Sequence, residues 1–255
     1  MTDTPLLACK RASKHFGAVV ALHEVDFEVL PGEVMALVGD NGAGKSTLIK
    51  GIAGIYPFDE GTIEFNGSPT TIHGPRDASR LGIEIVYQDL ALADNLDVVA
   101  NMFLGRERTQ NTLVLDEASM EQSARETLES LSVTTLRSVR QTVAGLSGGQ
   151  RQAVAVAKAV MWNSKLVILD EPTAALGVAQ TRQVLDLVRR LADQGLGVVI
   201  ISHNLHDIFE VADRITVLRL GQRVAVFDRR ETTQQEVVHA ITAGGMGEVP
   251  GMANE

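Results

Sequence analysis

The sequence has little of several residue types, and each shortage excludes a class of protein. Its 255 residues include one cysteine, Cys9, so no disulfide can form within the chain, which is typical of proteins in a reducing compartment. No signature of a catalytic cysteine surrounds Cys9, and we interpret it as a structural thiol. The apolar runs are far shorter than the ~20 residues of a membrane-spanning helix. The first residues also lack the basic and apolar segments of a secretory signal. We therefore expect a chain that neither crosses a membrane nor is secreted.

The chain also has fewer basic residues than acidic residues. The 23 Lys and Arg residues are outnumbered by 32 Asp and Glu residues, for a formal net charge of −9, whereas nucleic-acid-binding proteins usually carry a basic face. We therefore expect no nucleic-acid partner. Hydrophobic residues make up 45% of the chain, which is enough for a sizeable core in one large domain or in two interlocked subdomains.

The N-terminal part alternates short β-like runs with turn signals. Between Leu6 and Phe65, turns that contain Gly or Pro separate segments such as His23–Val29, a pattern that predicts a small antiparallel region. Val34 to Val38 is entirely apolar, as expected of a strand buried on both faces. This strand leads into a glycine-rich loop and then a helical pattern from Lys45 to Gly54. Another strand is expected at residues 83–88.

The middle of the chain has a helical pattern instead. From Asp89 to about Val160 turn signals are sparse, and the apolar positions Met120, Ala124, Leu128 and Leu131 recur at helical spacing. We expect a mostly helical insertion in this region.

Strand and helix patterns alternate after the insertion. Lys165–Asp170 and Gly197–Ser202 read as buried strands, separated by a helical pattern from Gln180 to Gly195 that ends at a glycine stop signal. This alternation predicts right-handed βαβ crossovers and a mainly parallel sheet in an α/β fold.

The C-terminal part predicts a hairpin and a last helix. Arg214–Phe227 reads as a hairpin that turns near Leu220 and Gly221. Thr233 and Glu236 have capping-box spacing and are expected to open a helix. Residues 245–255 are expected to be loose.

The segment GDNGAGKST at residues 39–47 matches the phosphate-loop pattern G-x-x-x-x-G-K-[ST]. The glycines let the backbone curl so that N–H groups face a phosphate, while Lys45 reaches the β- and γ-phosphates and Ser46 offers a hydroxyl to Mg²⁺. The position between a buried strand and a helix favours this function over a structural glycine turn. The predicted nucleotide-binding residues of this loop are Gly39, Asp40, Asn41, Gly42, Ala43, Gly44, Lys45, Ser46 and Thr47.

An acidic pair ends another predicted strand in LVILDEP, residues 166–172. Asp170 can hold a metal or its water, as the second acidic element of phosphate-loop ATPases does. Glu171 would then lie beside the γ-phosphate, where it is the natural general base for an attacking water. Two carboxylates that only end a strand for solubility are the alternative, which the phosphate loop makes less favoured.

Three further residues are candidates for the same edge of the sheet. Gln88 and His203 each follow a predicted strand, where ligands of open α/β folds bind. Phe16 lies in a turn before the core, where its ring can stack on adenine. A structural role for His203 and a packing role for Phe16 are the alternatives.

A second polar turn, LSGGQ at residues 146–150, opens a helical pattern. Unpaired backbone N–H groups and the positive end of the helix dipole meet at such a turn and favour an anion. The predicted anion-binding residues are Ser147, Gly148, Gly149 and Gln150. One nucleotide would then have two phosphate-binding loops in the same chain.

In this order, the motifs resemble those of the nucleotide-binding subunits of ABC transporters. Lys14–Gly17 resembles the adenine loop of that family, Tyr87–Asp89 the glutamine loop, LSGGQ the family signature and Ile201–His203 the switch-histidine segment. The resemblance covers nearly the whole chain, and LSGGQ is highly specific. It implies a RecA-like phosphate-loop ATPase core with a mainly parallel sheet, an N-terminal antiparallel β region and a helical signature subdomain.

The resemblance also implies roles for these residues and a partner for the second loop. In this family two ATPase domains pack head to tail, and the signature of one closes over the γ-phosphate held by the other. A second copy of the chain, ATP and Mg²⁺ are therefore implied. Glu171, His203 and Gln88 would be catalytic, and the metal would be held by Ser46, Gln88 and Asp170.

Longer segments narrow the resemblance to carbohydrate importers of the ribose, xylose and fructose group, most nearly their single-domain fructose-type ATPases. The segments are GDNGAGKSTLIKGIAG, QDLAL, NMFLGRE, EPTAALG, ISHN and VADRITVLRLGQR. One phosphate loop and one signature imply a homodimer with two ATP sites. Permease subunits, indirectly a solute-binding protein, and a peripheral location on the cytoplasmic side of the inner membrane are also implied.

The resemblance implies a single ATPase domain over residues 1–244, with a core of 1–88 and 161–244 and a helical subdomain of about 89–160. One departure concerns the segment after Glu171. Gly177 stands where the family usually has Asp in S-A-L-D, which puts in doubt a contact between the two sites through that Asp.

Three alternative functions belong to other classes. A soluble ABC-type ATPase acting on nucleic acid or ribosomes would resemble tandem-domain or coiled-coil proteins, and this sequence has neither a second cassette nor sustained heptads. A GTPase or small-molecule kinase would leave LSGGQ unexplained, and no N-K-x-D guanine-reading tetrad occurs. A non-catalytic regulatory binder is disfavoured by the intact Lys45, Asp170 and Glu171. The sequence leaves open which sugar or other solute is carried, and only the resemblance favours import over export.

Overall fold

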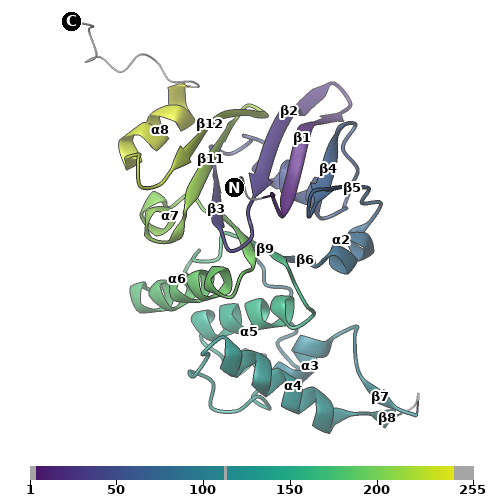
Figure 1. The fold of residues 1–255 in the computed structure, drawn as a ribbon. Coiled ribbons are helices and arrows are strands. Elements are labelled where there is room, and N and C mark those ends of the chain that lie inside the picture. The colour runs from purple at the N-terminus through teal and green to yellow at the C-terminus, as the bar shows by residue number, and fades with distance from the viewer. Residues whose placement is uncertain (1–3, 112–113, 244–255) are drawn as a thin grey trace, which may run out of the picture.

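The computed structural model describes residues 4–111 and 114–243 and contains two larger sheets with helices packed around them (Figure 1). The first sheet has the order β2-β1-β4-β5, and every neighbouring pair in it is antiparallel. Its strands are β1 (Leu7–Phe16), β2 (Val19–Val29), β4 (Glu60–Phe65) and β5 (Ser68–Thr70). The predicted antiparallel N-terminal region is therefore confirmed.

The second sheet is mainly parallel, as the βαβ pattern predicts. Its order is β12-β11-β3-β10-β9-β6, with only the edge strand β12 antiparallel to its neighbour. The strands are β3 (Val34–Val38), β6 (Ile83–Val86), β9 (Leu166–Asp170), β10 (Gly197–Ile201), β11 (Arg214–Arg219) and β12 (Gln222–Asp228). The hairpin of β11 and β12 turns at Leu220 and Gly221, where the sequence predicts it.

Strand β3 shows why the central strands are apolar throughout. Val34, Ala36 and Val38 belong to a core shared with the helices, whereas Met35 and Leu37 belong to a core shared with the N-terminal sheet. Side chains alternate between the two faces of a strand. Because both faces of this sheet are covered, all five residues of β3 are buried.

Helices surround the second sheet. These helices are α1 (Lys45–Ile52), α2 (Pro75–Leu81), α6 (Val178–Asp193), α7 (Leu205–Val211) and α8 (Gln234–Ala243). Helix α6 begins earlier than predicted and ends at Asp193, followed by Gln194 as its C-cap and by Gly195 with a φ of +90°. Thr233 and Glu236 make the predicted capping box, since each backbone N–H donates to the other side chain. The sequence analysis did not predict α2.

The segment between β6 and β9 contains several helices, which alternate with loops and a short hairpin. It contains α3 (Val98–Phe103), α4 (Glu117–Ser130), the short 3₁₀ turn η1 (Val143–Gly145) and α5 (Gly148–Val160). Met120, Ala124 and Leu128 of α4 are buried. Helix α5 packs against α6, and the two lie side by side in Figure 1.

This segment also contains a small hairpin that the sequence does not predict. Strands β7 (Thr109–Gln110) and β8 (Val114–Leu115) pair at the far end of the helical segment (Figure 1). Both hydrophobic residues of β8 are exposed, so the hairpin has no buried face and no alternating pattern to reveal it. The predicted tail at 245–255 lies outside the described residues. Within the described ranges, we find no helix long and apolar enough to cross a membrane.

Candidate functional site

The carboxyl ends of four neighbouring strands bring the predicted site residues to one edge of the second sheet. In the order β3, β10, β9 and β6, these strands are followed or ended by Gly39, His203, Asp170 and Gln88. The strands are in register, since Ile201 pairs with both Leu37 and Asp170. Residues far apart in the sequence therefore meet at one edge.

The loop from Gly39 to Thr47 has a backbone that requires glycine at two positions. Gly39 has a φ of +150°, and a Cβ there would collide with the carbonyl oxygen of Leu218. Gly44 has a φ of +104°, and a Cβ there would lie 2.8 Å from Cδ2 of Leu22. Left-handed backbone and a lack of space both exclude larger residues. The chain is thus curled tightly at the N-terminus of α1, where backbone N–H groups favour an anion.

A cavity of about 550 Å³ lies over this loop. Its lining residues come from β2, the loop, the start of α1 and the ends of β9 and β10, and include Val19, Val20, Lys45, Gln88, Asp170 and Glu171. The cavity therefore combines a cradle of backbone N–H groups with one cation, two carboxylates and two side-chain amides. It suits a ligand that carries phosphates and a metal ion.

Lys45 is held over the loop by two backbone carbonyls. Its Nζ donates to the oxygen of Gly39 at 2.6 Å and to that of Asp40 at 3.0 Å. Burial lowers the pKa of Lys45, although Glu171, Asp40 and Asp170 act in the opposite direction. Among the described residues that line the cavity, Lys45 is the only cation.

The two carboxylates differ in their surroundings. Burial raises the pKa of Asp170, and the neighbouring Glu171 adds to this, whereas Lys45 opposes it. Glu171 has a φ of +50° and donates its backbone N–H to the oxygen of Ile201. This turn directs Glu171 away from the strand and toward His203, whose Nδ1 lies 2.9 Å from Oε2 of Glu171. The Glu171 side chain is 17% exposed and that of His203 is 78% exposed.

A metal ion at this edge would need ligands of several kinds. Among the described residues, no group of three or more His, Cys, Asp or Glu side chains can hold a metal. Ser46, Gln88 and Asp170 nevertheless line the cavity together. Magnesium commonly uses one or two carboxylates, waters and substrate phosphates, so this oxygen set fits it.

Phe16 lies beside the cavity but is not one of its lining residues. Its ring is 47% exposed and meets Tyr56 edge to face, with 5.3 Å between centroids. Nζ of Lys14 lies 5.7 Å from the Phe16 ring and 5.4 Å from the Tyr56 ring. The hydroxyl of Tyr56 donates to the oxygen of Thr47 at 3.2 Å, so the two rings are linked to the phosphate loop.

Sequence reasoning missed Tyr56, Val19 and Val20. Tyr56 follows α1 closely, and in a chain with 4% aromatic residues an aromatic side chain just after a phosphate-loop helix was a usable signal. Val19 and Val20 begin β2 opposite Phe16 and His15. No local pattern distinguishes them from other strand residues.

The signature residues lie in a different part of the molecule. Ser147 caps α5, and its hydroxyl and the Gln150 side chain form a reciprocal capping box. A Cβ on Gly148 would lie 2.8 Å from Cδ2 of Leu176. None of the four signature residues is among the described residues that line the cavity over the phosphate loop. The structure therefore does not bring the two anion loops together within one chain.

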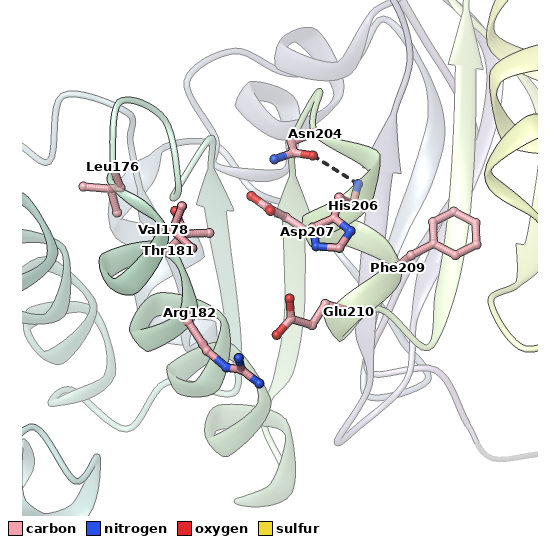
Figure 2. A pocket seen from close by; sticks show the side chains of 9 residues that line it. All are labelled: Leu176, Val178, Thr181, Arg182, Asn204, His206, Asp207, Phe209 and Glu210. Atoms are coloured by element: carbon pink, nitrogen blue, oxygen red, sulfur yellow. Dashed lines mark hydrogen bonds between the residues drawn. The ribbon is translucent and has the colours of Figure 1, made fainter.

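A larger cavity, of about 710 Å³, lies between α6 and α7 (Figure 2). Arg182 and Glu210 face it from opposite helices, and Val178 at its edge is 91% exposed. The buried carboxylate of Asp207 accepts a hydrogen bond from Thr173 at 2.7 Å. No residue of the phosphate loop is among the described residues that line this cavity. We take the cavity of about 550 Å³ as the candidate functional site, because the phosphate loop, Asp170 and Glu171 line it.

Comparison with known proteins identifies one family. The family model described as "ABC transporter" matches residues 22–174. The chain is 46% identical over 248 residues to the fructose import ATP-binding protein FrcA of Rhizobium meliloti, covering 95% of each chain. It is 46% identical over 244 residues to the xylose/arabinose import ATP-binding protein XylG of Sulfolobus acidocaldarius, covering 96% of each. A solved nucleotide-free ATP-binding cassette from an ABC transporter is similar with a TM-score of 0.79 and 27% identity, covering 93% of this chain and 95% of that one.

Proposed function

Because this chain belongs to the ABC transporter family, we propose that it is the ATP-binding and ATP-hydrolysing subunit of an importer that energises sugar uptake through separate permease subunits. One observation carries the proposal, namely 46% identity along almost the full length to two sugar import ATP-binding proteins. We place the subunit peripherally, on the cytoplasmic side of the inner membrane.

Deletion of the gene tests this function directly. Uptake of labelled fructose, xylose and ribose is measured in the source strain, in the deletion strain and in the deletion strain that carries the gene on a plasmid. The proposal expects uptake of at least one sugar to fall with deletion and to return with the plasmid. Unchanged uptake of all three would contradict a function in the import of these sugars.

The phosphate loop would hold the ATP phosphates. Backbone N–H groups of residues 39–47 surround the β-phosphate, while the ammonium of Lys45 leaves its loop carbonyls for the β- and γ-phosphates. Ser46, Gln88 and Asp170 would hold Mg²⁺, which neutralises charge on the phosphate oxygens. Phe16, backed by Tyr56, would stack on adenine.

Glu171 is placed to act as the general base for hydrolysis. Its carboxylate would accept a proton from the water that attacks the γ-phosphate. The contact of 2.9 Å between Nδ1 of His203 and Oε2 of Glu171 would hold the carboxylate in place. The His203 ring, which is 78% exposed, would also be accessible to the γ-phosphate.

A second copy of the chain would complete the site. Within one chain, Ser147 to Gln150 lie apart from the phosphate loop, so their N–H groups need another molecule's phosphate. We infer a head-to-tail homodimer with two ATP sites. Gly177 stands where the family pattern has Asp, so any contact there between the two copies lacks that carboxylate.

Replacing Phe16 with Ala is expected to weaken ATP binding by about fivefold or more, because stacking of a base on an aromatic ring contributes roughly 1–3 kcal/mol. Binding of inorganic tripolyphosphate, which has no base, should not change. Isothermal calorimetry of both ligands measures the difference, and Phe16→Tyr, which keeps the ring, is the matched control. An equal loss for ATP and tripolyphosphate would contradict a stacking role.

The permease would dock beside the glutamine loop. A groove of about 260 Å³ lies between the end of β6 and the helical segment, and Tyr87, Leu90, Ala91, Met102 and Trp162 line it. A partly apolar groove of this kind, next to residues that would hold the nucleotide, can couple hydrolysis to a neighbouring subunit.

Cross-linking tests that docking. With Cys9 replaced by Ser, a cysteine at each position from Ala91 to Leu96 should cross-link to a membrane protein in native membranes. A cysteine at the exposed Val226 of β12 is the control and should not. Mass spectrometry identifies the product. A result in which no position from 91 to 96 captures a membrane protein would count against the docking site.

A further inference from the structure

The groove beside the glutamine loop carries a net positive charge. Its floor is apolar and includes Met102, Ala155 and Ala159, but three charged residues also line it, Glu84, Arg106 and Lys158. Two are cations and one is an anion, so the groove is positive in a chain whose formal net charge is −9.

Arg106 and Glu84 neutralise each other. Nη2 of Arg106 lies 3.1 Å from Oε1 of Glu84, and the same nitrogen donates to Oγ of Ser79 at 2.7 Å. Oγ of Ser79 in turn donates to Oε1 of Glu84 at 2.7 Å. The guanidinium also lies 5.2 Å from the ring of Trp162. Arg106 is therefore fully engaged at the edge of the groove.

Of the three charged residues that line the groove, Lys158 is the one without an ion-pair partner in the described part of the chain. It is partly buried on α5. Its ammonium makes no side-chain hydrogen bond or ion pair with the described residues, and only the longer-range charges of Arg106 and Glu84 act on it. Burial and the repulsion of Arg106 lower the pKa of Lys158, whereas the attraction of Glu84 acts in the opposite direction. A partly desolvated ammonium in an apolar groove costs free energy that a carboxylate from a partner would offset.

On the basis of the proposed function, we propose that the permease segment seated in this groove is apolar and carries one carboxylate that pairs with Lys158. The apolar side chains of the segment would cover Tyr87, Met102 and the exposed Leu104, while its acidic residue would lie over α5. The small residues Ala155 and Ala159, on either side of Lys158 along the helix, leave room for the segment to approach. The ion pair would then fix the orientation of the segment in the groove.

Charge reversal tests the pairing. The source strain carries Lys158→Glu, Lys158→Gln or Lys158→Arg in place of the native gene, and uptake of the sugar lost on deletion is measured. Uptake should fall by about tenfold or more with Glu, because truncating or reversing one partner of a desolvated pair is strongly unfavourable. It should fall less with Gln and stay near wild type with Arg, which keeps the charge.

Lys165→Glu is the matched control. Lys165 is an exposed lysine after α5 that is not a lining residue of the groove, so the same charge change should leave uptake intact. Each purified variant must also unfold at the wild-type temperature and bind ATP. If Lys158→Glu fails this check, the Gln variant decides, because it removes the charge alone.

Suppressor selection identifies the partner. Mutations that restore uptake to the Lys158→Glu strain should replace an acidic permease residue with a neutral or basic one. Normal uptake in both the Glu and Gln variants, or suppressors that never change an acidic permease residue, would overturn the pairing. If deletion and Lys45→Ala also leave uptake intact, the proposed function fails, and the pairing fails with it.

Discussion

Replacing Glu171 with Gln slows ATP hydrolysis by about 10² to 10⁴-fold, because the amide keeps the size and reach of the side chain but cannot accept a proton. ATP then persists in the site. In the proposed dimer, Lys45 of one copy and Ser147 to Gly149 of the other would contact the same nucleotide, so bound ATP is expected to stabilise the dimer by linkage. Light scattering should therefore detect an ATP-dependent dimer of the Glu171→Gln protein.

Variants at Ser147 test whether an ATP-dependent dimer forms through the shared nucleotide site or through another surface. In the Glu171→Gln background, Ser147→Phe should prevent the dimer, because a bulky side chain occupies the space of the partner's phosphates. Ser147→Ala loses the helix cap, which costs about 1 kcal/mol, but keeps a small residue and should still form dimers. ATP binding to the single chain should survive in both. A monomeric Glu171→Gln protein at saturating Mg²⁺ and ATP, with binding confirmed, would contradict the shared site.

Replacing Lys45 with Ala should weaken ATP binding by roughly 30-fold or more and abolish measurable hydrolysis. Lys45 is the only cation among the described residues that line the cavity, and one charge-assisted contact of this kind contributes roughly 2–5 kcal/mol in a desolvated site. Fluorescence titration with a labelled ATP analogue and a phosphate-release assay measure the two effects.

Lys50→Ala is the control for this change. Lys50 is an exposed lysine in the last turn of α1 and does not line the cavity. The control removes a positive charge from the same helix, so a general loss of charge would affect both variants alike. Wild-type hydrolysis in the Lys45→Ala protein would show that the loop does not hold the phosphates.

The local elements of the site were readable from the sequence. The segment from Val34 to Lys45 contains an all-apolar strand, then two obligatory glycines and then a lysine at the start of a helix. Because these features follow one another closely in the sequence, each supports the interpretation of the next. The capping of α8 by Thr233 and Glu236 is local in the same way, since it depends on residues three positions apart. Interactions between residues only a few positions apart can be predicted from their spacing in the sequence.

The hairpin of β7 and β8 and the link from Tyr56 to Phe16 were not readable. The hairpin has no buried face, so the hydrophobic pattern carries no signal. Tyr56 meets Phe16 only because β1 and the segment after α1 lie together in the folded chain. The pairing of Arg106 with Glu84, and the lack of such a partner for Lys158, likewise follow from packing of α3, α5 and β6.

Periodicity and turn chemistry within a few residues were enough to predict most of the strands and helices, the phosphate loop and the acidic pair, and the motifs in their order indicated the family. Helix α2 and the hairpin of β7 and β8 were not predicted. The sequence predicts Gln88 and His203 at the carboxyl edge of the sheet, but only the tertiary structure gives the strand order and register that bring them there together with Asp170. The tertiary structure also shows that no signature residue is among the described residues that line the cavity over the phosphate loop of its own chain. It also decided that Lys158 remains a charge without a partner among the described residues. The physical reason is that strand order, register and burial arise from contacts between segments far apart in the chain, and spacing along the sequence does not record them.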